Sequence, residues 1–130
     1  MQFGFGAYRP PKRFEGRYLR ESEHESAVLE IEDVGEGFVY VRGLAFWGMK
    51  NPRGPNIGEV EFKAPLVGDE ICFEDRSTHR NEAYRLKLLL RQNRLVAEEE
   101  YVVGYFGMNV SFAGEYQKEP RMREEDAAPI

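Results

Sequence analysis

One pattern, Phe-x-Gly-x-Tyr-x-(Arg/Lys)-Glu, occurs near both ends of this 130-residue chain, as FEGRYLRE over residues 14–21 and FAGEYQKE over residues 112–119. In each copy Phe, Gly and Tyr stand at alternate positions, which is the spacing of a β-strand with one face in a core. Two matching strands at opposite ends favour a sheet that closes on itself. We therefore predict that residues 14–20 pair with residues 112–118. We also expect Gly16 and Gly114 to be adjacent, where the sheet bends or a neighbour packs closely.

Alternating apolar and polar segments, separated by polar turns, fill the chain between these two copies. The longest is FVYVRGLAFW, residues 38–47, which is apolar on both faces. About eight short strands with such turns are typical of an antiparallel barrel, and up-and-down closure is the simplest topology. We predict an all-β, lipocalin-like barrel over residues 14–119. Residues 1–13, which contain Pro10 and Pro11, are expected to form an extended N-terminal arm, and residues 120–130 a flexible tail.

Residues 82–100 leave two interpretations open. They are rich in good helix formers, and Leu86, Leu89 and Leu90 would lie on one helical face. The alternation of Tyr84, Leu86, Leu88 and Leu90 with charged residues, followed by a polar step at Gln92 and Asn93, favours a β-hairpin instead.

Charge argues against nucleic-acid binding. The formal net charge is -5, from 18 Lys and Arg against 23 Asp and Glu, whereas neutralising phosphates needs a clustered basic excess. The basic residues of segment 9–20 are followed by or interleaved with glutamates, which is typical of a solvated strand surface. No stretch approaches the length of a spanning helix, so we expect no membrane segment and a cytoplasmic protein, or a periplasmic one if a signal peptide was removed.

Residues with catalytic or metal-binding chemistry are sparse. Cys72 is the single cysteine, and His24 and His79 both lie in polar turns. The densest group of metal-ligand types, ESEHE at residues 21–25, lacks a second segment with suitable spacing. Carboxylate pairs for acid-base catalysis could come from Glu59 and Glu61 or from residues 98–100, but alternation places most of these outward. We expect no cofactor and no enzymatic activity.

From Asn56 onward, the layout NIGEVEFKAPLVGDEICFED, YRLKLLLRQNRLVAEEE and GMNVSFAGEYQK resembles small bacterial lipocalin-like barrels, including those related to periplasmic lysozyme inhibitors. The most specific positions are Gly107, Val110, Phe112, Gly114 and Tyr116. The resemblance implies the barrel architecture. It does not extend to the paired cysteines of such inhibitors, because Tyr84 and Phe106 stand near the places where those cysteines would be expected.

Two loops carry the best candidates for a binding site. One group leads into the Gly- and Pro-rich loop after residue 47, and the other lies in the loop GYFGM; together they are Phe46, Trp47, Met49, Tyr105, Phe106 and Met108. Aromatic and Met side chains are enriched at binding surfaces and ligand mouths, although they can also simply close the ends of a barrel. We predict a module that binds an apolar small molecule or a protein partner there. An acidic inhibitor or immunity-like protein that blocks a basic enzyme is the alternative, and a homodimer through strand 38–47 is a further expectation.

Overall fold

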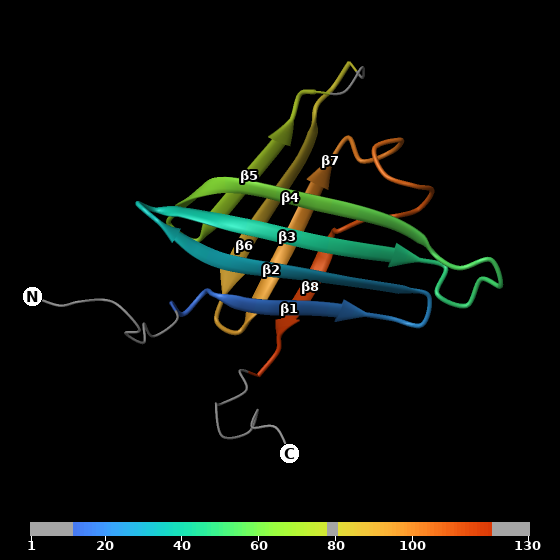
Figure 1. Cartoon of the computed structure of the whole chain (residues 1–130), viewed down its shortest axis with the longest axis horizontal. Helices are drawn as coiled ribbons and strands as arrows, with labels where there is room; N and C mark the ends of the chain where they lie inside the picture. The colour runs from blue at the N-terminus through green and yellow to red at the C-terminus, as the bar shows by residue number, and fades with distance from the viewer. Residues whose placement is uncertain (1–11, 78–80, 121–130) are drawn as a thin grey trace, which may run out of the picture.

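The computed structural model describes residues 12–77 and 81–120, which form eight antiparallel strands in a closed barrel (Figure 1). In chain order these are β1 (Gly16–Glu21), β2 (Glu25–Gly35), β3 (Phe38–Trp47), β4 (Asn56–Val67), β5 (Glu70–Asp75), β6 (Tyr84–Arg91), β7 (Arg94–Glu100) and β8 (Gly114–Lys118). Each strand pairs with the next, and β8 pairs with β1. The predicted all-β, up-and-down barrel is confirmed. The predictions for segments 1–11 and 121–130 of the arm and tail lie outside the described residues.

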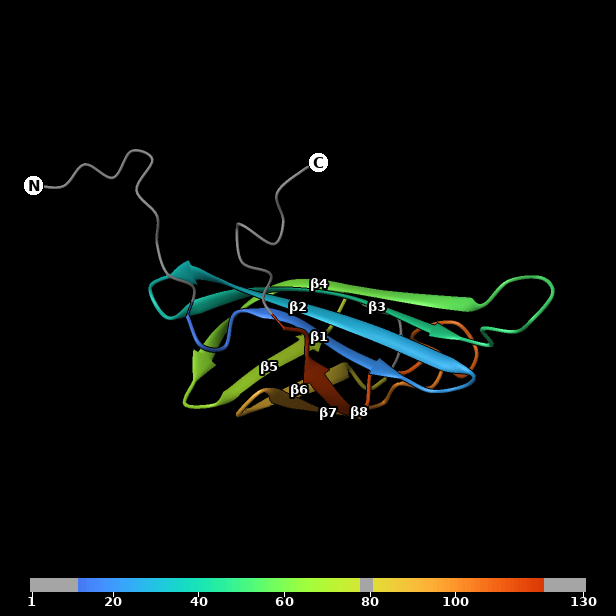
Figure 2. The same ribbon diagram turned by 90° about the horizontal axis from the view of Figure 1, so that it is seen from below.

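The barrel is flattened, with β1–β4 in one layer and β5–β8 in the other (Figure 2). The ladders within the first layer are long, since β3 is paired with both β2 and β4 from Phe38 to Trp47. The ladders that join the layers are short. At one corner β4 meets β5 through the pairs Leu66–Ile71 and Val67–Glu70, and at the other β1 meets β8.

Strand β3 shows how alternation fills the interior. Its residues Val39, Val41, Gly43 and Ala45 are buried, while the positions between them face outward. Gly43 is needed for close packing, because a Cβ there would lie 2.7 Å from Cδ2 of Leu29 and 2.8 Å from Cε1 of a core phenylalanine. The largest fully buried side chains are Tyr18, Tyr84, Tyr116 and Phe112. The interior is therefore occupied by the protein's own aromatic and aliphatic groups.

The predicted pairing between the first and last strands, which we call the seam, is present. Strands β1 and β8 pair at Tyr18–Lys118 and Leu19–Gln117, which confirms the pairing of the two repeated segments. The predicted adjacency of Gly16 and Gly114 is wrong. An antiparallel register places the two glycines toward opposite ends of the seam, a detail that depends on the offset between the strands and not on either strand's own pattern.

The two copies of the repeat also fold alike. The Tyr18 hydroxyl donates to the Phe14 carbonyl oxygen at 2.8 Å, and the Tyr116 hydroxyl donates to the Phe112 carbonyl oxygen at 2.6 Å. Each tyrosine thus satisfies its buried hydroxyl on the backbone four residues earlier in its own copy.

Residues 84–100 form the β6–β7 hairpin, so the hairpin interpretation is confirmed and the helical alternative is wrong. Leu86, Leu88 and Leu90 are buried on one face of β6, and Asn93, in the turn between β6 and β7, has a positive φ of 58°. Strong helix propensity is overridden here because only a strand directs all three leucines to the same side.

Candidate functional site

All six residues predicted for binding lie at one end of the barrel, which we call the loop mouth and define by loops 22–24, 48–55 and 101–113. In an up-and-down barrel these connections share one end because they follow strands that run in the same direction. The longest of them, loop 101–113, joins β7 to β8 and is visible in orange in Figure 1. It is the feature around which the candidate site is built.

Loop 101–113 has a defined backbone. The amide of Tyr105 donates to the Val102 carbonyl oxygen at 2.9 Å, and that of Val110 to the Gly107 carbonyl oxygen at 3.1 Å. Tyr101 has a φ of 57°, a left-handed conformation that is costly for an aromatic residue and that surrounding contacts must maintain.

The aromatic side chains of the loop close the mouth. The Tyr105 ring stacks on the Tyr84 ring, with centroids 4.1 Å apart and planes at 7°. Phe106 meets Tyr84 and Phe112 edge to face, at 5.2 and 5.4 Å. Gly58 of β4 makes room for it, since a Cβ there would lie 2.8 Å from the Phe106 ring. Tyr105 and Phe106 therefore cap the hydrophobic core.

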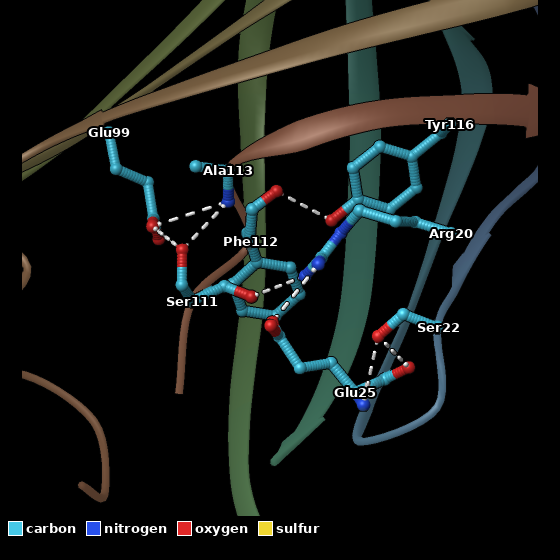
Figure 3. A network of polar contacts seen from close by, with 8 residues as sticks. All are labelled: Arg20, Ser22, Glu25, Glu99, Ser111, Phe112, Ala113 and Tyr116. Carbon is cyan, nitrogen blue, oxygen red and sulfur yellow. Dashed lines mark hydrogen bonds and ion pairs between the residues drawn. The ribbon is translucent and has the colours of Figure 1, made fainter. Parts of the chain in front are cut away.

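Two inward-facing carboxylates hold the loop from below. Glu99 accepts hydrogen bonds from the Tyr84 hydroxyl at 2.5 Å, from the Ser111 hydroxyl at 2.6 Å and from the Ala113 amide at 3.3 Å. The last two are drawn in Figure 3. Asp75 accepts a hydrogen bond from the Tyr105 hydroxyl. The C-terminal end of the loop and the Tyr105 side chain are thus tied to the barrel wall.

Arg20 ties the loop to the β1–β2 hairpin. Its Nη2 donates to the Ser111 carbonyl oxygen at 2.8 Å and its Nη1 contacts Oε1 of Glu25 at 3.2 Å, as Figure 3 shows. The Arg20 side chain is 17% exposed, and its Nε is buried with no hydrogen-bond partner among the described residues. Arginine suits this position because its planar group can bind a carbonyl and a carboxylate in fixed directions.

Burial and hydrogen bonding shift the pKa values of Tyr84 and Asp75 in opposite directions. Burial, followed by the charge of Glu99, raises the pKa of Tyr84 far above its ordinary value. The hydrogen bonds from Ser77, and then from Tyr105, lower the pKa of Asp75 below its ordinary value. At neutral pH the Tyr84 hydroxyl is therefore a donor and the Asp75 carboxylate an acceptor, and their hydrogen bonds hold the loop in place.

The structure places the six predicted residues differently from one another. Tyr105 and Phe106 come together in the cap described above. Trp47 packs against the core, and its cross-strand partner Asn56 donates to the Met108 carbonyl oxygen at 3.0 Å, which links the two loops. Phe46 faces the outer side of the sheet, because it alternates with the buried Ala45. It is the one predicted residue directed away from the loop mouth.

The outer side of the loop mouth carries apolar side chains that the aromatic cap leaves uncovered. Val103 is 88% exposed, Met108 75% and Met49 46%. We call these three residues the loop surface. Of the three, Val103 was missed from the sequence because a lone valine in an apolar loop does not differ in pattern from a core residue.

Metal and membrane features are limited in the described part of the chain. Residues 12–77 and 81–120 contain no cluster of three or more His, Cys, Asp or Glu side chains arranged to hold a metal ion. They also include no helix with the length and apolarity that a membrane span needs. No family model matches the chain, and no curated protein or solved structure compared with it gives a significant match.

Proposed function

We propose that this protein is a non-enzymatic binding module that recognises a protein partner through the loop surface. The observation that carries the proposal is the contrast within loop 101–113. Its inner side chains are fixed by stacking and by hydrogen bonds to Glu99 and Asp75, while Val103 and Met108 are largely exposed. Exposed apolar groups on a loop that is already ordered are suited to binding, because little conformational entropy remains to be lost.

A protein partner fits better than an apolar small molecule inside the barrel. Tyr105 and Phe106 occupy the mouth through which such a ligand would enter, and Tyr84 and Phe112 fill the space below them. The exposed apolar side chains of the loop offer contacts to a surface that packs over them, whereas small-molecule sites are concave.

The test compares the wild-type protein with the double variant V103D/M108D. The immobilised full chain is used to capture partners, and any protein retained is purified and titrated in solution. We expect the double variant to weaken the measured affinity by at least about tenfold, which corresponds to roughly 1.4 kcal/mol, because two charges would be placed in an apolar interface.

Val67→Asp is the matched control. Val67 is 70% exposed and lies beside the β4–β5 turn at the opposite end of the barrel. A partner lost by V103D/M108D and kept by Val67→Asp supports the proposal. Equal binding by wild type and V103D/M108D, with both folded by circular dichroism, would contradict it.

A second candidate function is inhibition of a basic enzyme. The net charge of -5 and the exposed carboxylates of Glu98 and Glu100 just before loop 101–113 favour a positively charged partner. Residues 56–118 resemble, in barrel architecture alone, proteins related to lysozyme inhibitors, so lysozyme is chosen as the basic enzyme for the test. Addition of this protein to a lysozyme cell-wall assay tests it directly. We expect inhibition that weakens as salt is raised, and the absence of inhibition at low salt would count against this candidate.

A further inference from the structure

A concave site lies at the end of the barrel opposite the loop mouth. A depression of about 380 Å³ opens between the β4–β5 turn at Gly68 and Asp69, the β6–β7 turn at Gln92 and Asn93, and the residues that precede β1. We call it the turn-mouth site. It shares no lining residue with the loop surface.

The floor of the turn-mouth site is apolar. It is lined by Phe14, Tyr18, Leu66 and Leu90, of which Tyr18 and Leu90 belong to the buried core while Phe14 and Leu66 pack against it. The Tyr18 hydroxyl is already donated to the Phe14 carbonyl oxygen, so Tyr18 contributes mainly its ring. An apolar group placed on this floor would be shielded from water, which is the main source of affinity in small-molecule sites.

The rim of the site is basic although the protein as a whole is acidic. Arg13 and Arg91 stand among its lining residues, with Asp69 as the one carboxylate there. Arg91 donates through Nη1 to the neighbouring Leu90 carbonyl oxygen at 3.0 Å, which leaves its other donors for a ligand. Within residues 12–77 and 81–120, neither guanidinium is ion-paired with a carboxylate.

We propose that the turn-mouth site binds a small amphipathic carboxylate, with its apolar part on the floor and its carboxylate between Arg13 and Arg91. Two guanidinium groups against one carboxylate favour an anion over a cation, and the fork of an arginine matches the two oxygens of a carboxylate. The volume suits a short alkyl chain or a single aromatic ring. This proposal is independent of the loop surface, since the two sites lie at opposite ends of the barrel.

Octanoate is a suitable probe. The full, isotopically labelled chain is titrated with octanoate and followed by its backbone amide resonances in NMR spectra. We expect saturable shifts at Gly68 and Asn93, with small changes at Val103. 1-Octanol, which has the same chain without the charge, and octylammonium, which reverses the charge, should both bind more weakly. Saturable shifts confined to the loop mouth, or no saturable shift at all, would overturn the proposal.

The double variant R13Q/R91Q tests the role of the rim. We expect it to raise the dissociation constant for octanoate by about tenfold, because both partners of the carboxylate are removed. The control R42Q/R53Q lowers the net charge by the same amount at positions outside the site and should bind octanoate as the wild type does. Octanoate binding that is equal in the two double variants would refute the assignment. Because both arginines of the site are on the surface, the fold should persist, and the unchanged amide spectrum of β3 verifies this.

Discussion

Arg20 and Lys118 occupy equivalent positions in the two copies of the repeated segment, and each lies over the tyrosine of the other copy. The guanidinium carbon of Arg20 is 5.6 Å from the centroid of the Tyr116 ring, and the Lys118 ammonium is 5.9 Å from that of Tyr18. Each strand therefore places its cationic side chain on the tyrosine ring of the other strand, where the cation makes a favourable contact with the ring face.

The same two cationic side chains also bind the backbone next to the other copy of the repeat. Arg20 donates to the carbonyl oxygen of Ser111 at 2.8 Å, and Lys118 donates to that of Arg13 at 2.5 Å. Ser111 and Arg13 each stand immediately before the Phe of a copy, so the two interactions are related by approximate twofold symmetry. The repeated segments 14–21 and 112–119 thus make reciprocal contacts with each other, and these contacts close the barrel.

The seam glycines should differ in their tolerance of a side chain. A Cβ at Gly114 would lie 2.7 Å from Cδ of Arg20, and one at Gly16 would lie 2.7 Å from Cε of Lys118; φ is +134° and +150° respectively. The Arg20 guanidinium is held by the Ser111 carbonyl oxygen and the Glu25 carboxylate, whereas the contact at Gly16 is with Cε of the long Lys118 side chain, which can bend away by rotation about more bonds. We expect Gly114→Ala to cost about 1–3 kcal/mol of unfolding free energy and Gly16→Ala to cost less. Urea denaturation of both variants checks this, and the opposite ranking would show that Arg20 is easily displaced.

The buried tyrosines should make the protein sensitive to alkali. Burial raises the pKa of Tyr116 to about 12 and raises the pKa values of Tyr84 and Tyr18 as well. These groups ionise near pH 10 in the unfolded chain. Their contribution to stability is therefore fully present below about pH 10 and is lost as pH rises toward 12. Denaturant melts across this range, with tyrosinate absorbance as the readout, should show falling stability; a flat profile would contradict the burial of these hydroxyls.

Acid should loosen the aromatic cap at the loop mouth. Hydrogen bonds from Ser77, then from Tyr105, lower the pKa of Asp75. Its contribution is present above the ordinary aspartate pKa and is lost as pH falls through the lower folded value. Asp75→Asn should mimic part of this loss at neutral pH. We expect faster hydrogen exchange at Tyr105 and Val110 in the variant, with β3 unchanged. Unaltered exchange at both amides would mean that stacking on Tyr84 alone holds the loop.

The outer face of β3 is the surface on which we expect a second copy to dock. Phe38 and Leu44 are 37% and 38% exposed there, and Phe46 and Ile57 are neighbours across the β3–β4 ladder. A twofold dimer would cover this face. Light scattering over a range of concentrations should detect a dimer that Leu44→Glu removes. A wild-type monomer at all concentrations would eliminate this interface.

The alternation of apolar and polar residues predicted which side chains are buried, because every second residue of a barrel strand faces the interior. The same rule would have identified Glu99, which follows Leu95 and Ala97 on the inward face of β7. From the sequence, Glu99 was considered only within the run 98–100, as a carboxylate for acid-base catalysis, and not as an anchor for the loop, because a run of three glutamates is usually a solvated surface. The role of Arg20 was not predicted for the same reason, because residues of both charge signs surround it in the sequence and such a mixture is typical of a solvated surface. The offset between β1 and β8 could not be predicted, because neither strand's own pattern specifies its register against a strand 98 positions away.

The two short ladders at the corners of the barrel, β4 with β5 and β1 with β8, have a consequence for how the molecule fluctuates. Few backbone hydrogen bonds must break to part either corner, while each layer keeps its own ladders intact. Opening motions would then begin at these corners and separate two four-stranded sheets as units. The slowly exchanging amides of this protein should accordingly divide into two cooperative groups, β1–β4 and β5–β8, each losing protection as a whole.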